Sequence, residues 1–133
     1  MARSSAAQPL VSPGPTIVLV EAKPLMRMAV AAYLRECGYQ VIETTGPAEA
    51  RRLLQSGTMA DLALIDIDAD RESDGFELAQ WLRLQRPDIK VLLTSGVQRT
   101  AQTAGDLCEQ GPHLANPYHP RNLEAQIRRL LAH

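Results

Sequence analysis

Acidic and hydroxyl-bearing side chains stand at the ends of three apolar runs in the sequence. Glu21 follows "TIVLV", Asp66 ends "DLALID", and Thr94 comes near the end of "IKVLLTS". Short apolar runs bounded by turn residues are typical of buried parallel strands. Binding groups of an open parallel sheet gather at the carboxyl ends of its strands. We therefore expect these side chains, with Asn116 after the weaker run "HLANP", to share one edge of a sheet and to form a polar site there.

The segments beside these runs predict the elements that hold the site in place. A further run, "YQVIET" from Tyr39, completes five predicted strands. Helical spacing separates the runs: Met26, Ala29, Tyr33 and Cys37 recur at intervals of three and four residues and form one apolar stripe. Alternation of strand and helix over this length predicts an α/β domain, with an open parallel sheet, helices on both faces and right-handed crossovers.

The fourth predicted helix, near residues 100–110, has the weakest pattern. Gly105 lies inside it, and the side chains available for burial are mainly Ala101, Ala104 and Cys108. A glycine in the interior of a helix destabilises it, so we expect this helix to be short or mobile. The last predicted helix has a continuous apolar stripe instead, formed by Leu123, Ile127, Leu130 and Leu131.

Length and composition indicate one domain. The chain has 133 residues, of which 45% are hydrophobic, and this is ample for a single core. Residues 1–15 are rich in Ser, Ala, Pro and Gly and are predicted to be a disordered tail before a domain of residues 16–133. The tail lacks the apolar stretch of a secretory signal, and no run is long enough to span a membrane. A cytoplasmic location is therefore expected.

The charge balance of the sequence limits the classes of partner that we expect. The net charge is −1, with 14 basic and 15 acidic residues. This balance gives no reason to expect nucleic acid or a membrane surface as a partner, so proteins and small ions are expected.

Cys37 and Cys108 each lie in a helical pattern rather than in a paired ligand spacing. Both are expected to be reduced thiols that pack in the core.

Several stretches, in their order and spacing, resemble the receiver domain of two-component response regulators. They are "VLVEAKPLMRM", "DLALIDIDAD" followed by "DGFELAQWLR", "VLLTSG", and "LANPYHPRNLEAQIRRLL". The resemblance covers residues 17–131. It implies a flavodoxin-like (βα)5 fold, in which helices cover both faces of a five-stranded parallel sheet with the strand order 2-1-3-4-5.

The resemblance also implies a site. In this family an aspartate at the end of the third strand accepts a phosphoryl group from a phosphohistidine, and Asp66 occupies that position. A magnesium ion normally reduces the repulsion between the carboxylate and the phosphoryl group. By position, Glu21, Asp66 and the backbone carbonyl of Asp68 would hold this ion. Thr94 matches the hydroxyl that senses the phosphoryl group, and His113 matches the aromatic position that moves with it.

Two positions depart from the family pattern. Ala22 stands where a second acid usually binds the metal, and Asn116 stands where a lysine usually contacts the phosphoryl oxygens. The expected magnesium site is therefore weakened or lost, and phosphoryl transfer is expected to be slow. Lys23 has a flexible side chain that could replace either missing group, or it could be an ordinary surface lysine.

The function implied by the resemblance is that of a single-domain response regulator, a phosphoacceptor signalling domain rather than an enzyme. Its expected partners are a histidine kinase or a histidine phosphotransfer protein, and a downstream protein target. The surface of the fourth helix, fifth strand and fifth helix is where such a partner, or a second copy in a homodimer, would bind.

Three alternative interpretations remain open at this point. The chain could be a pseudo-receiver, in which the same fold binds a protein without phosphorylation. "LIDIDAD" also resembles the Asp-x-Asp motif of haloacid-dehalogenase-type phosphatases, with Asp66 and Asp68 at the right spacing, but Ala69 and the late Asn116 do not fit that family. Finally, an aspartate at a strand end can simply cap a loop or a helix.

Overall fold

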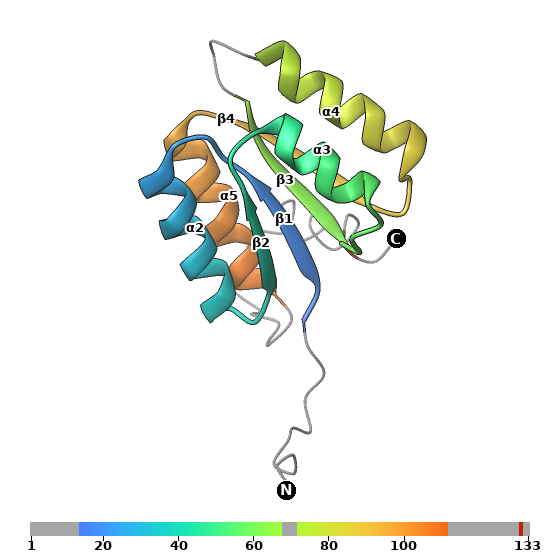
Figure 1. Cartoon of the computed structure of the whole chain (residues 1–133). Helices are drawn as coiled ribbons and strands as arrows, with labels where there is room; N and C mark the ends of the chain where they lie inside the picture. The colour runs from blue at the N-terminus through green and yellow to red at the C-terminus, as the bar shows by residue number, and fades with distance from the viewer. Residues whose placement is uncertain (1–13, 68–71, 112–130, 132–133) are drawn as a thin grey trace, which may run out of the picture.

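The computed structural model describes residues 14–67, 72–111 and 131, as alternating strands and helices (Figure 1). The strands are β1 (Thr16–Val20), β2 (Gln40–Thr44), β3 (Leu62–Ile67) and β4 (Lys90–Ser95). The helices are α2 (Pro24–Glu36), α3 (Pro47–Gln55), α4 (Glu72–Gln85) and α5 (Val97–Gln110).

The four strands form one parallel sheet in the order β2-β1-β3-β4. This confirms the predicted α/β class and the predicted order of the first four strands. The predicted fifth strand lies outside the described residues, as does all of the last predicted helix except Leu131.

Alternate side chains of each strand face opposite layers, and this period of two divides the core. Ile17 and Leu19 of β1 and Leu64 of β3 belong to a cluster with residues of α2 and α5. Val18 and Ile65 belong to a second cluster, with residues of α3 and α4. The two pairs of helices lie on opposite faces of the sheet in Figure 1. Because β1 and β3 are covered on both faces, their sequences are continuous apolar runs.

Helix α2 follows β1 directly and shapes the carboxyl edge of the sheet. Pro24 is its first residue, where the fixed φ of proline favours the first helical turn. Gly38 follows its end with a φ of 105°, in the left-handed region that favours glycine. Val30 and Leu34 are buried, whereas Tyr33 is 43% exposed, so the buried face is rotated slightly from the predicted stripe.

Helix α5 is longer than its sequence pattern predicted, and the expectation of a short helix was wrong. It runs without a break from Val97 to Gln110 and packs against α2. Leu107 is fully buried and Ala104 nearly so. The sequence interpretation overlooked Leu107, and packing against α2 offsets the low helix propensity of Gly105. The expected mobility of this helix stays a prediction.

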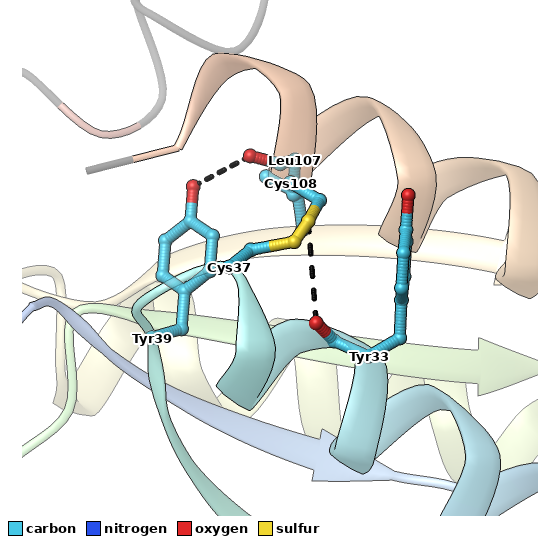
Figure 2. Close-up of a disulfide and its surroundings, with 5 residues drawn as sticks. All are labelled: Tyr33, Cys37, Tyr39, Leu107 and Cys108. Atoms are coloured by element: carbon cyan, nitrogen blue, oxygen red, sulfur yellow. Dashed lines mark hydrogen bonds between the residues drawn. A yellow bond between two sulfur atoms is a disulfide. The ribbon is translucent and has the colours of Figure 1, made fainter. Parts of the chain in front are cut away.

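A disulfide joins Cys37 and Cys108 and ties the C-terminal ends of α2 and α5 together (Figure 2). The two Cα atoms are 5.1 Å apart, within the range that a disulfide bridges. The expectation of two reduced thiols was therefore wrong, because helices separated in the sequence face each other. Beside the bond, the buried Tyr39 hydroxyl donates to the carbonyl of Leu107 at 2.8 Å. Burial raises the pKa of Tyr39 to about 12.

In the part of the chain that the structure describes, no helix is long and apolar enough to cross a membrane. Strand β1 begins at Thr16. The division of the chain into a tail of residues 1–15 and a domain of residues 16–133 stays a prediction.

The disulfide can be tested by mass and by stability. Without reductant, the intact chain should be lighter by two hydrogen atoms than the reduced chain. Cys37→Ser and Cys108→Ser should each lower the free energy of unfolding by about 2–4 kcal/mol, because each opens a loop with a sequence separation of 71 residues. Urea denaturation with and without reductant measures this difference. A wild-type mass equal to that of the reduced chain, and no effect of reductant on stability, would contradict the bond.

Candidate functional site

Three of the predicted site residues end neighbouring strands on one face of the sheet. Asp66 and Thr94 are direct register partners between β3 and β4. Glu21 follows Val20, which is the register partner of Ile65 in β3. Each site residue lies two positions beyond a leucine that packs in the core between the sheet and the α2–α5 pair, namely Leu19, Leu64 and Leu92. The period of two therefore places all three side chains toward α2 and α5.

Glu21 is a buried carboxyl with an incomplete set of partners. Its side chain is almost inaccessible, with 1% of the residue exposed. Oε2 accepts the backbone N–H of Lys23 at 3.0 Å, whereas Oε1 has no hydrogen-bond donor among the described atoms. Burial raises the pKa of Glu21, and the nearby carboxyl of Asp66 adds to this rise. The Lys23 N–H and the Lys23 charge act in the opposite direction. Glu21 thus retains a proton more readily than an exposed glutamate does.

Asp66 is held on one oxygen by two hydroxyls. Its Oδ1 accepts a hydrogen bond from Thr100 Oγ1 at 2.5 Å, and Thr94 Oγ1 lies 3.4 Å from the same oxygen. The two hydroxyl oxygens are 2.9 Å apart. Thr100 is fully buried in the first turn of α5. The sequence analysis missed Thr100 as a site residue, because its place in a weakly predicted helix gave no sign that it reaches the sheet edge.

A small pocket opens beside Asp66 at the carboxyl edge of the sheet. Its volume is about 60 Å³, which is room for an ion and a few waters. Asp66 and Ala22 line this pocket together with the start of α3 and with Gly75. Ala22 therefore presents a methyl group where the family pattern has a second acid, so the pocket has one carboxylate fewer than that pattern requires.

The turn between β1 and α2 is fixed by contacts that do not use the pocket. Arg27 Nη1 donates to the backbone carbonyl of Glu21 at 3.2 Å, and its Nε lies 3.5 Å from a carboxylate oxygen of Glu43. The N–H of Glu21 donates to the carbonyl of Thr44 in β2. Lys23 is exposed at the N-terminal cap of α2. The backbone thus presents Glu21 toward Asp66 without help from the Lys23 side chain.

The remaining predicted site residues, Asp68, His113 and Asn116, lie outside the described residues. Within the described ranges, no group of three or more potential metal-ligating side chains is found. Two carboxyls, Glu21 and Asp66, do lie together, and the unpartnered Oε1 of Glu21 is the kind of oxygen that a divalent cation would satisfy. Magnesium binds through one or two carboxylates and retains several waters. The described residues therefore fit a magnesium ion, in a site with few protein ligands.

The chain has clear relatives. Residues 17–128 match the response regulator receiver domain family. The transcriptional regulatory protein GltR of Pseudomonas aeruginosa is 31% identical over 121 residues, which cover 89% of this chain and 49% of GltR. The response regulator receiver protein CpdR of Brucella abortus is 31% identical over 116 residues, which cover 86% of this chain and 95% of CpdR. The chain belongs to the receiver domain family of two-component response regulators.

A solved structure supports the fold. The response regulator protein TrrA from Thermotoga maritima, crystallised in complex with Mg²⁺-BeF, superposes with a TM-score of 0.59 at 23% sequence identity. The match covers 88% of this chain and 99% of TrrA. Receiver domains generally bind Mg²⁺ at the phosphorylation site. In contrast to TrrA, GltR is about twice as long as the part that matches this chain.

The burial of Glu21 makes a prediction about pH. Because its folded pKa is raised, the folded protein binds the proton more tightly than the unfolded chain does. The contribution of Glu21 to stability is therefore largest below the ordinary glutamate pKa of 4.5, and it falls as the pH rises through the raised value. Glu21→Gln should remove this fall, and at pH 8 without divalent ions it should be about 1 kcal/mol more stable than the wild type, because it buries no charge.

Urea denaturation at pH 4 and pH 8 measures the difference. At pH 4 the two proteins should be nearly equal, and Mg²⁺ at pH 8 should stabilise the wild type more than the variant. Glu36→Gln, which changes an exposed glutamate of α2, is the matched control and should leave the pH profile unchanged. A Glu21→Gln protein that is less stable than the wild type at pH 8 would show that the ionised carboxylate is already well partnered.

Proposed function

We propose that the chain accepts a phosphoryl group on Asp66 from a phosphohistidine of a histidine kinase or phosphotransfer protein, and that it signals by protein contact. The observation that carries this proposal is the arrangement of Asp66. Its carboxylate lies beside buried Glu21 and lines a small pocket, and in the described part of the chain the hydroxyl contacts are to one of its two oxygens. A carboxylate that merely capped a helix would need neither the second buried carboxyl nor the pocket.

The chemistry follows from that orientation. Among the described residues, the hydroxyl contacts of Asp66 are both to Oδ1, and we therefore propose Oδ2 as the oxygen that attacks phosphorus. A bond forms from Oδ2 to phosphorus as the bond from phosphorus to the donor nitrogen breaks, and the nitrogen leaves with its electron pair. When bound, a magnesium ion would offset the negative charge shared by the carboxyls and the phosphoryl oxygens. Glu21 and Asp66 would hold this ion, with the carbonyl of Asp68 as a further ligand by position.

Ala22 and Asn116 make this a slow receiver in our proposal. Ala22 removes a carboxylate from the pocket, and Asn116 replaces the cation that the family pattern places against the phosphoryl oxygens. A hydrogen bond to a charged group contributes roughly 1.5–3 kcal/mol, which corresponds to about a ten- to hundredfold change in rate. Lys23 follows the pocket residue Ala22 in the sequence, and its charge acts on Glu21, but its exposed position favours a surface role.

The signal would leave through the surface that changes when Asp66 is phosphorylated. Thr94 and His113 form the predicted switch. It would act on the surface of the fourth predicted helix, which is α5, and of the predicted fifth strand and last helix. This surface would bind the downstream protein or a second copy of the chain. Helix α5 is the described part of that surface. Its first turn contacts Asp66 through Thr100, which supports its place in the response.

A second function is favoured by Ala22. With a methyl group at this pocket position, two carboxyls of the described residues, Glu21 and Asp66, are available to a metal. A receiver that binds no metal would act as a phosphorylation-independent binding module. Membership of the receiver family argues against the phosphatase interpretation of Asp66 and Asp68.

Phosphorylation can be tested by intact mass after incubation with acetyl phosphate, with and without Mg²⁺. The wild type should gain one phosphoryl group in a magnesium-dependent reaction, and Asp66→Asn should gain none. Asp88→Asn, which changes an exposed carboxylate paired with Arg86, is the matched control and should react like the wild type. Asn116→Lys should accelerate the gain about ten- to hundredfold. A folded wild-type protein that gains no mass at high donor and Mg²⁺ would favour the binding-module function instead.

A further inference from the structure

Thr100 contacts the Asp66 carboxylate and was not among the residues predicted for the site. Its Oγ1 lies 2.5 Å from Asp66 Oδ1, 2.9 Å from Thr94 Oγ1 and 3.2 Å from the carbonyl of Gly96. The residue has no exposed surface. Burying a hydroxyl without hydrogen-bond partners costs free energy, so the three polar neighbours are what allow Thr100 to be fully buried.

The number of hydroxyl protons determines which oxygen is the donor and which the acceptor in each of these contacts. Each threonine has one O–H proton to donate. The ionised carboxylate of Asp66 only accepts, and its contact with Thr100 is the shortest, so the Thr100 proton points to Asp66 Oδ1. The 2.9 Å contact between the hydroxyls must then be a donation from Thr94 to Thr100. The contact from Thr94 to Asp66 is longer, at 3.4 Å. Thr94 therefore reaches Asp66 through Thr100.

Thr100 also has a second acceptor within its own helix. The carbonyl of Gly96, one turn earlier, is 3.2 Å from its Oγ1, which is a common back-bond for threonine in a helix. The hydroxyl can thus donate either to Asp66 or to the start of α5. When Asp66 becomes an acyl phosphate, its Oδ1 loses its negative charge and becomes a weaker acceptor. The preferred direction of the Thr100 proton would then change.

We propose that Thr100 is a positioning residue for the acceptor: its hydroxyl orients the Asp66 carboxylate with Oδ2 toward the donor, and it transmits the charge state of Asp66 directly to the first turn of α5. Thr94 acts through Thr100. The orientation of Asp66 is a property of the unphosphorylated protein, whereas the transmission to α5 rests on the proposed function.

Two substitutions separate the hydroxyl from the rest of the side chain. Thr100→Val keeps the branched shape but has no hydroxyl, and Thr100→Ser keeps the hydroxyl but loses the methyl group. The side-chain carboxyl carbon of Asp66, observed by NMR in the unphosphorylated full chain, should shift in Thr100→Val and return toward the wild-type position in Thr100→Ser. Thr94→Val should shift it less. The phosphorylation rate with acetyl phosphate should fall about tenfold in Thr100→Val and recover in Thr100→Ser.

The two readouts distinguish failure of this inference from failure of the proposed function. If the wild type accepts no phosphoryl group, the Asp66 carbon shifts still test the orientation by Thr100. Equal shifts in the serine and valine variants, or a valine variant that matches the wild type, would overturn the positioning role. A larger effect of Thr94→Val than of Thr100→Val on either readout would overturn the order of the two hydroxyls.

Discussion

The arrangement of the site is governed by two carboxyls that parallel strands bring together at one edge of the sheet. The register of β1, β3 and β4 places Glu21 beside Asp66 and Asp66 beside Thr94, on the face that α2 and α5 cover. Two ionised carboxylates at such short range repel each other, and burial together with the carboxyl of Asp66 raises the pKa of Glu21. A shared proton, a cation or donated hydrogen bonds can relieve this repulsion. The Thr100 hydroxyl that donates to Asp66, and the raised pKa by which Glu21 retains a proton, are two of these forms of relief.

Helix α5 supplies a hydrogen-bond donor to this pair of carboxyls from outside the sheet. Its first turn supplies Thr100, which donates to Asp66. Its last turn is held by the disulfide from Cys108 to Cys37, and by the Tyr39 hydroxyl on the Leu107 carbonyl. The N-terminal end of the helix thus contacts Asp66, and its C-terminal end is tied to α2. A change at Asp66 would act on the N-terminal end of a helix that is anchored at its C-terminal end.

The sequence predicted the sheet and the acidic edge because both follow from local patterns. Continuous apolar runs identified β1 and β3, and residues two positions beyond a core leucine had to share its face. Thr100 and the disulfide of Cys37 and Cys108 could not be predicted in this way, because they depend on which helix covers that face. The spacing of apolar residues within α5 indicates a helix, but it does not show that Cys108 faces Cys37, which is 71 positions away in the sequence.

The most direct measurement is a Mg²⁺ titration of the full chain, followed by backbone amide NMR. The account predicts that the amides of Glu21, Ala22 and Ile67 shift together with a single midpoint, and that Asp66→Asn and Glu21→Gln each weaken this binding. These shifts would show that Glu21 and Asp66 form a cation site despite the alanine at position 22. An unchanged spectrum at concentrations far above the physiological range would contradict the account, because the repulsion between Glu21 and Asp66 would then be relieved by a proton alone.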